Sequence, residues 1–237
     1  MNTSSYRDHF WEHGYVLIEN FFDSALMDRL DRVIVDHFGS DPGFAHNDEF
    51  LTKAKTQVIP WFPQDGGNLA FDGIDIYPDF NQITAEILGP AWQRLYCMVM
   101  FSKRGTSGQA WHQDCAPENP AIYNLNRLVY TSDITDEIGG QTVIVPGTHK
   151  SGLLPAGNPA VEFDRQVTLK PKRGTLVFLH GHTWHRVLPI KGAYRVSTNY
   201  RAVPAGVPPN ITDICVYRNM RYQFSTSKVV EERVATS

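Results

Sequence analysis

The segment GTLVFLHGHTWHRVLPIKGAYRVSTNYRAV, residues 174–203, decides the fold class of this chain. It holds two runs rich in β-branched and aromatic residues, GTLVFLH and YRVSTNYRAV, and a stretch interrupted by Gly and Pro between them. Runs of this length and composition, bounded by turn residues, are typical of β-strands. Because no helical segment of comparable length separates them, the pattern favours antiparallel pairing.

Four further runs with the same features lie upstream. They are RLYCMVMFSK (94–103), LNRLVYTSDI (125–134), QTVIVPG (141–147) and RQVTLK (165–170). Together they predict a mainly β fold, an antiparallel sandwich or barrel over residues 93–203.

The helical signals precede this region. A short helix is predicted over residues 5–14, and the strand-like YVLIENFF (15–22) follows it. In SALMDRLDRVIVDHFG (24–39), apolar residues recur at helical intervals and charged residues lie on the other face, which predicts an amphipathic helix capped by Asp23. A further helix is predicted over residues 79–92.

The whole chain, residues 1–237, is predicted to form a single domain. Residues 5–92 supply helices, a first strand and a loop over 40–75, whose Gly, Pro and polar content predicts a lid. The tail over 204–237 is as compatible with an arm that forms a homodimer as with a strand that closes over the core.

Composition narrows the classes of partner. The 237 residues are 42% hydrophobic and carry a net charge of −3 without long runs of either sign, which argues against nucleic-acid binding. No run of apolar residues is long enough to span a membrane, and the N-terminus lacks a signal-peptide pattern. The charge therefore favours a small-molecule or protein partner. The three cysteines are odd in number and show no CxxC spacing, so a cytoplasmic location is expected.

The first chemical candidate is AWHQDC (110–115), in which His112 and Asp114 are two positions apart. On an extended strand both side chains point the same way, so one imidazole and one carboxylate can meet a single ion. His46 and Asp48 have the same spacing, but they lie in the Gly- and Pro-rich loop. The strand context therefore favours His112 and Asp114 as metal ligands.

A third ligand is expected from VFLHGHTWHRV (177–187), which contains His180, His182 and His185. Two histidines and one carboxylate on one face of an ion leave the opposite positions open, as in non-haem Fe(II) enzymes that activate oxygen. If residues 185–203 form a hairpin centred near Ile190, His185 faces the same way as Arg195 and Ser197. A register slip of one residue would favour His182 instead.

Arg195 and Ser197 form a second constellation. An arginine two residues from a serine on an inward strand face offers a planar fork and a hydroxyl, which suit a small carboxylate. The alternative is an arginine on an outward face that pairs with solvent or an acid.

The ordered set WHQD, GGQTVIVPGTHKSG and RGTLVFLHGHTWHRV, followed by RVS, resembles the phytanoyl-CoA dioxygenase family of Fe(II)- and 2-oxoglutarate-dependent oxygenases. The resemblance extends over about residues 7–203. It implies a double-stranded β-helix, the jelly-roll or cupin-like core, with helices packed outside, and O2 as co-substrate.

The resemblance also implies roles for individual residues. His112, Asp114 and His185 match the family's iron ligands, Arg195 matches the arginine that binds the distal carboxylate of 2-oxoglutarate, and Ser197 matches its hydroxyl companion. His180 and His182 match no ligand position, and His149 belongs to a structural turn. Related halogenases replace the carboxylate ligand with a small residue, so Asp114 favours hydroxylation or a related oxidation.

Substrate selectivity is expected in side chains that face the metal from the mouth of the barrel or lie in the 40–75 loop. The candidates are Trp61, Phe62, Phe101, Gln109, Trp111, Tyr123, Asn199 and Arg201. If Arg195 and Ser197 point inward, strand alternation also turns Asn199 and Arg201 inward, so one of these two is a candidate receptor for a polar or anionic substrate. For each aromatic residue the alternative is ordinary packing.

Two other function classes are open at this point. A cupin-like metalloenzyme of isomerase or hydrolase chemistry could use the same triad, but Arg195 and Ser197 would then have no carboxylate to bind. A non-catalytic binding protein could share the scaffold, but it would not need an intact triad.

Overall fold

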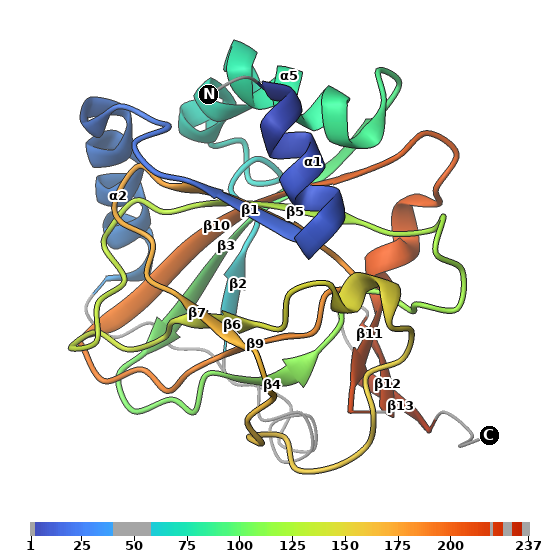
Figure 1. Cartoon of the computed structure of the whole chain (residues 1–237). Coiled ribbons are helices and arrows are strands. Elements are labelled where there is room, and N and C mark those ends of the chain that lie inside the picture. The colour runs from blue at the N-terminus through green and yellow to red at the C-terminus, as the bar shows by residue number, and fades with distance from the viewer. Residues whose placement is uncertain (1–2, 40–57, 219, 225–228, 234–237) are drawn as a thin grey trace.

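Two antiparallel sheets pack face to face in the computed structural model of this chain (Figure 1). The structure describes residues 3–39, 58–218, 220–224 and 229–233. The larger sheet has the strand order β1 (Tyr15–Ile18), β8 (Leu176–His180), β5 (Leu125–Val129), β10 (Tyr194–Val203), β3 (Gln93–Lys103) and β2 (Ile59–Trp61). The smaller sheet has the order β4 (Gln109–His112), β9 (His185–Val187), β6 (Thr142–Ile144) and β7 (Val167–Leu169). This arrangement confirms the predicted jelly-roll class.

The inner faces of the two sheets share one apolar cluster. Leu128, Val177 and Leu179 enter it from the larger sheet, and Ile144 and Leu169 enter it from the smaller one. Because side chains alternate across a strand, the polar residues on these same inner faces lie between the sheets and beside this cluster. The functional side chains are therefore enclosed by both sheets.

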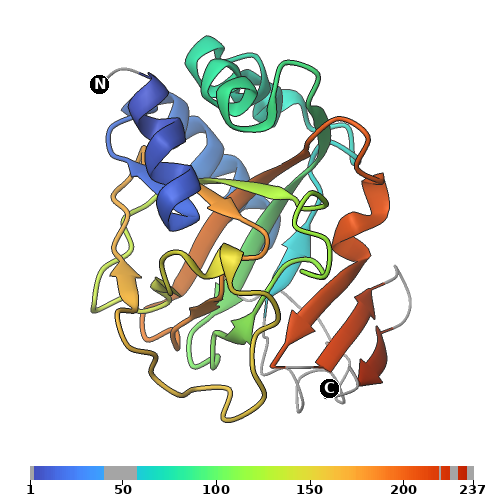
Figure 2. The same ribbon diagram turned by 45° about the vertical axis from the view of Figure 1, so that its right-hand side comes forward.

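Helices cover the outer face of the larger sheet (Figures 1 and 2). They are α1 (Thr3–His13), α2 (Ser24–Phe38), α4 (Asp72–Asp75) and α5 (Pro78–Leu88). Short 3-10 turns are η1 (Leu69–Phe71), η2 (Thr148–Lys150) and η3 (Pro209–Asp213). As predicted, Asp23 caps α2: its carboxylate accepts a hydrogen bond from the Leu26 amide at 2.8 Å. The predicted helix over 79–92 ends earlier, at Leu88, with Gly89 in a left-handed conformation.

The predicted hairpin between residues 185–187 and 194–203 is wrong. β9 pairs with β4 and β6 in the smaller sheet, whereas β10 pairs with β3 and β5 in the larger sheet. Both edges of β10 are occupied, so β9 has no free edge to join. The connection at Pro189 passes from one sheet to the other, which local turn signals cannot distinguish from a hairpin.

The described part of the predicted lid loop contains secondary structure. Residues 58–75 contain β2, η1 and α4, and Ile59 and Trp61 of β2 share the outer face of the sheet with Phe101 and Val99. Prolines at 60 and 63 concealed this edge strand in the sequence. Residues 40–57, with His46 and Asp48, lie outside the described residues.

The C-terminal tail forms a third antiparallel sheet from β11 (Ile214–Tyr217), β12 (Met220–Phe224) and β13 (Val229–Arg233). A β-bridge joins Val216 of β11 to Gln113, directly beyond β4. The tail therefore closes over the core of its own chain. Within the described residues, no helix has the length and apolar character required to cross a bilayer.

Candidate metal centre

His112 and His185 lie opposite each other on neighbouring strands. β4 pairs with β9 in a register that sets His112 against His185, and cross-strand partners of an antiparallel pair project from the same face. The two ring centroids are 4.1 Å apart. The register of the smaller sheet, rather than a hairpin with β10, therefore brings these histidines together.

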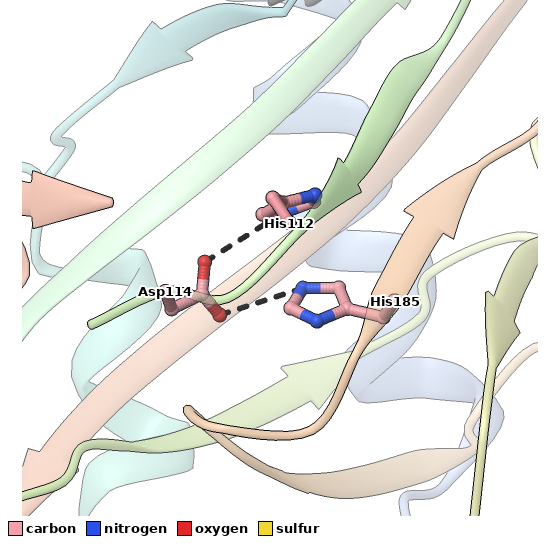
Figure 3. A group of neighbouring side chains, drawn as sticks. All are labelled: His112, Asp114 and His185. Atoms are coloured by element: carbon pink, nitrogen blue, oxygen red, sulfur yellow. Dashed lines mark ion pairs between the residues drawn. The ribbon is translucent and has the colours of Figure 1, made fainter. Parts of the chain in front are cut away.

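Asp114 completes the group two residues beyond His112. Its backbone amide donates to the Gly181 carbonyl at 2.8 Å, which holds the chain where it leaves β4. The carboxylate lies between the rings, with Oδ1 3.7 Å from His112 Nε2 and Oδ2 3.5 Å from His185 Nε2 (Figure 3). One ligand atom from each residue fits within 4.8 Å of the other two, and all three residues are buried.

Backbone carbonyls fix the orientation of both rings. His112 Nδ1 is 2.8 Å from the Ala110 oxygen, and His185 Nδ1 is 2.8 Å from the Thr183 oxygen. A carbonyl oxygen can only accept, so each Nδ1 carries the hydrogen and each Nε2 keeps a lone pair. This arrangement orients metal-binding histidines in proteins.

The electrostatics keep the group in its ligating form. Burial and the neighbouring His185 lower the pKa of His112 to about 3, so the ring is neutral at pH 7. Burial by itself raises the pKa of Asp114, but Arg201 and the two histidines outweigh burial and hold that pKa well below its ordinary value. The site thus presents the Nε2 atoms of two imidazoles and one carboxylate, a donor set that suits ferrous iron.

Arg195 lies on the inner face of β10 without an acidic partner. Its guanidinium donates to Ser197 Oγ at 2.7 Å, to the Gly140 carbonyl at 3.2 Å and to Thr142 Oγ1 at 3.4 Å. It is only 3% exposed, and the salt bridges of the described residues do not include it. Burial lowers its pKa. A buried cation of this kind is costly unless an anion joins it, so the site fits a ligand carboxylate.

Gly140 makes room for this arginine. Its φ is +68°, and a Cβ at this position would lie 2.7 Å from Arg195 Cγ. Glycine is therefore required where the backbone passes the guanidinium.

The other three histidines of the predicted motifs form a separate group, which we call the packing histidines: His149, His180 and His182. His180 stacks on Tyr123 with centroids 4.3 Å apart and lies 5.0 Å from His182 and 5.1 Å from His149. Among the described residues, the only group with metal-binding geometry is the triad, which includes none of them.

Four of the predicted substrate residues face away from the triad. Phe101 stacks on Phe38, and Trp61 stacks on His37, both on the helical side of the larger sheet. Trp111 precedes His112 and so projects from the outer face of the smaller sheet, against Phe163. Tyr123 stacks on His180. Strand alternation, which the sequence pattern did not resolve, explains the corrections for Trp61, Phe101 and Trp111.

The other four candidates have different surroundings. Gln109 pairs with Val187 on the face that carries His185, and Phe62 contacts Tyr96 with centroids 5.5 Å apart. Asn199 and Arg201 project inward from β10, as predicted. The Arg201 guanidinium, however, donates to Asp114 Oδ1 at 3.1 Å, so its partner in this structure is a triad residue rather than free space for a substrate anion.

Two residues that contact the triad were missed from the sequence. Asn126 Nδ2 donates to Asp114 Oδ2 at 2.6 Å, and a polar residue within the buried run LNRLV was a signal for it. Tyr217 stacks on His112 with centroids 4.9 Å apart and an interplanar angle of 13°. No pattern in the tail pointed to Tyr217.

Comparison with known proteins gives one family match. The family model described as phytanoyl-CoA dioxygenase (PhyH) matches residues 10–194 of the chain. A comparison with curated protein sequences gave no match.

Several solved structures share the fold. The non-haem α-ketoglutarate-dependent epimerase SnoN from nogalamycin biosynthesis is 16% identical, with a TM-score of 0.68 over 95% of this chain and 87% of that one. SnoN in complex with Fe3+, α-ketoglutarate and nogalamycin RO is 18% identical, with a TM-score of 0.66 over 87% and 86%. HygX from Streptomyces hygroscopicus, with nickel and 2-oxoglutarate bound, is 14% identical, with a TM-score of 0.66 over 87% and 88%.

Proposed function

This chain belongs to the phytanoyl-CoA dioxygenase family, and on that premise we propose that it is an Fe(II)- and 2-oxoglutarate-dependent oxygenase that oxidises a small molecule. The cofactors are Fe(II) and 2-oxoglutarate, and O2 is the co-substrate. One observation carries the proposal: a buried His112, Asp114 and His185 triad shares its enclosure between the sheets with a buried guanidinium that lacks an anion.

His112 Nε2, His185 Nε2 and one Asp114 oxygen would hold the iron. The carbonyls of Ala110 and Thr183 keep both rings turned toward it, and burial keeps His112 neutral and able to coordinate. Three protein ligands leave the remaining positions for 2-oxoglutarate and O2.

Arg195 would bind the distal carboxylate of 2-oxoglutarate. Its Nη1 also donates to Ser197 Oγ, whose hydroxyl can rotate to give the same carboxylate a further donor. Thr142 and Gly140 fix the guanidinium plane from the smaller sheet. The receptor is thus preorganised, which reduces the ordering cost of binding.

When bound, iron and 2-oxoglutarate couple decarboxylation to succinate and CO2 with a two-electron oxidation of the substrate. The protein's own contribution is to orient both partners and exclude water from the space between the sheets. Because Asp114 occupies the carboxylate position, we propose hydroxylation or a related oxidation rather than halide transfer. A non-oxidative reaction would leave Arg195 without a ligand.

Anaerobic reconstitution tests this proposal. Addition of Fe(II) and then 2-oxoglutarate to the metal-free protein should produce the weak visible charge-transfer band of the chelate, and admission of O2 should produce succinate. Bound Fe(II) with neither a band nor succinate would contradict the proposal.

A further inference from the structure

Arg201 places a positive charge in contact with the metal ligand Asp114. It lies on the inner face of β10, six positions after Arg195, and its Nη2 donates to Asp114 Oδ1 at 3.1 Å. The side chain is 7% exposed, and among the salt bridges of the described residues its only carboxylate partner is Asp114. A guanidinium remains protonated in proteins, so this charge is permanent.

The second oxygen of Asp114 has a neutral donor. Asn126 Nδ2 donates to Oδ2 at 2.6 Å, and Asn126 Oδ1 in turn accepts from Asn199 Nδ2 at 2.8 Å. Both Asp114 oxygens are therefore held by the larger sheet, although all three ligands come from the smaller sheet and its extension. Asn126 already fixes the carboxylate without adding charge, so orientation alone does not require an arginine.

Unlike Asn126, Arg201 changes the total charge around the metal position. The Asp114 carboxylate contributes −1 and Arg201 contributes +1, so the charges of this pair cancel before a metal binds. Every metal-bound state is then one unit more positive than in a triad without the arginine. In a buried site, an added cation disfavours a trivalent ion more strongly than a divalent one.

We propose that Arg201 biases the metal centre toward Fe(II) over Fe(III), and so keeps the iron in the oxidation state that the proposed function requires. The inference rests on that proposed function. It also replaces the interpretation of Arg201 as a receptor for an anionic substrate. Arg201 acts through Asp114 and is a positioning and charge-balancing residue rather than a catalytic one.

Two opposing effects decide whether replacement of Arg201 raises or lowers the affinity for the metal. Loss of a supporting hydrogen bond to a ligand typically weakens metal binding 10- to 100-fold. Loss of a cation one carboxylate away from the ion acts in the opposite direction, because the repulsion between two positive charges is screened less in a buried site than in water. Because Asn126 still holds the carboxylate, we expect the charge effect to dominate.

The test compares the one-electron midpoint potential of the iron-loaded wild type with that of two variants, without 2-oxoglutarate. Arg201→Met removes the charge and should shift the Fe(III)/Fe(II) equilibrium toward Fe(III) by roughly 10- to 100-fold, at about 59 mV per tenfold. Arg201→Lys keeps the charge and should remain within about threefold of the wild type. Co(II) affinity should rise in Arg201→Met, which is opposite to the result expected when support for a ligand is lost.

The outcomes are distinct. An unchanged potential in Arg201→Met, or an equal shift in Arg201→Lys, would overturn the inference, since a merely structural role would not separate the two variants. If Arg201→Met does not fold, Arg201→Gln removes the same charge and keeps an amide donor. A wild-type protein that binds no iron would instead refute the proposed function.

Discussion

Two groups of histidines lie in the same half of this molecule, and only one of them is built to bind a metal. The triad histidines, His112 and His185, each give Nδ1 to a backbone carbonyl and turn Nε2 toward Asp114. In contrast, the packing histidines lie against aromatic rings, and His180 Nδ1 accepts from the His182 amide. A backbone carbonyl alone does not distinguish the groups, since His149 Nε2 also lies 3.2 Å from the Trp11 oxygen. The difference is the carboxylate that both triad rings face, rather than the number or spacing of histidines.

The largest effect is expected from a variant that weakens 2-oxoglutarate binding and leaves metal binding by the triad unchanged. Arg195→Met should weaken 2-oxoglutarate binding by roughly 100-fold, because a buried charge pair loses its protein partner. The triad should still bind a divalent ion with unchanged affinity, since Arg195 bonds to Ser197, Gly140 and Thr142 and not to the triad. Titration of the visible chelate band gives the first quantity, and equilibrium dialysis with Co(II) gives the second.

Ser197→Ala is the matched control for this variant. It leaves the guanidinium in place and should cost about tenfold or less in 2-oxoglutarate affinity. Equal losses in both variants would argue that the strand, rather than the charge, had been disturbed.

The packing histidines should affect stability rather than metal binding. His180→Ala removes a buried ring that stacks on Tyr123 and leaves the His182 amide without its acceptor. We expect a loss of about 2–4 kcal/mol in the free energy of unfolding, from the cavity and the unpaired amide together. Urea denaturation checks the loss, and Co(II) stoichiometry should equal that of the wild type. A stable variant that binds no metal would break the comparison.

Tyr217, in the C-terminal tail, contacts the triad by stacking on His112. Stacking of a ring on His112 is worth about 1 kcal/mol, so Tyr217→Leu should weaken Co(II) binding by about threefold to tenfold. Tyr217→Phe keeps the ring and should bind Co(II) with nearly wild-type affinity. If the two variants behave alike, the stack carries no part of the metal affinity.

The packing histidines should also make the stability of the protein depend on pH. Burial lowers the pKa values of His149 and His182 to about 4, below the value near 6.5 expected in the unfolded chain. Between pH 6.5 and 4 the unfolded chain therefore binds more protons, so the stability of the metal-free protein should fall as the pH falls through this window. His112 contributes with the same sign, so the diagnostic quantity is the difference between wild type and His182→Asn.

His182→Asn should show a shallower loss over this window in denaturation curves at pH 7, 6 and 5. An identical pH dependence in the two proteins would show that His182 is not kept neutral by the fold.

Local patterns predicted most of the elements. Asp23 and the apolar spacing over 24–39 located α2, and runs of β-branched residues located β3, β8 and β10. These signals depend only on nearby residues, so they predict an element without knowledge of what packs against it. The edge strand β2 was missed because its prolines resemble those of a loop.

Sequence patterns could not predict which residues distant in the chain contact each other. The hairpin argument that favours His185 is wrong, although the family resemblance points to the same residue. In the structure, the register of β4 with β9 brings His185 to His112. Arg201 was correctly expected to project inward, but its partner Asp114 lies 87 positions away in sequence. Alternation fixes the face of a side chain, whereas only the packing of the two sheets fixes what it meets.

The most direct test of the account is the metal stoichiometry of His185→Ala and His182→Ala, measured by anaerobic dialysis against Fe(II) and compared with the wild type. The two side chains are three positions apart, and both are buried. We expect one ion per chain in the wild type and in His182→Ala, and none in His185→Ala. Retention of iron in a folded His185→Ala, with loss in His182→Ala, would contradict the assignment of the triad.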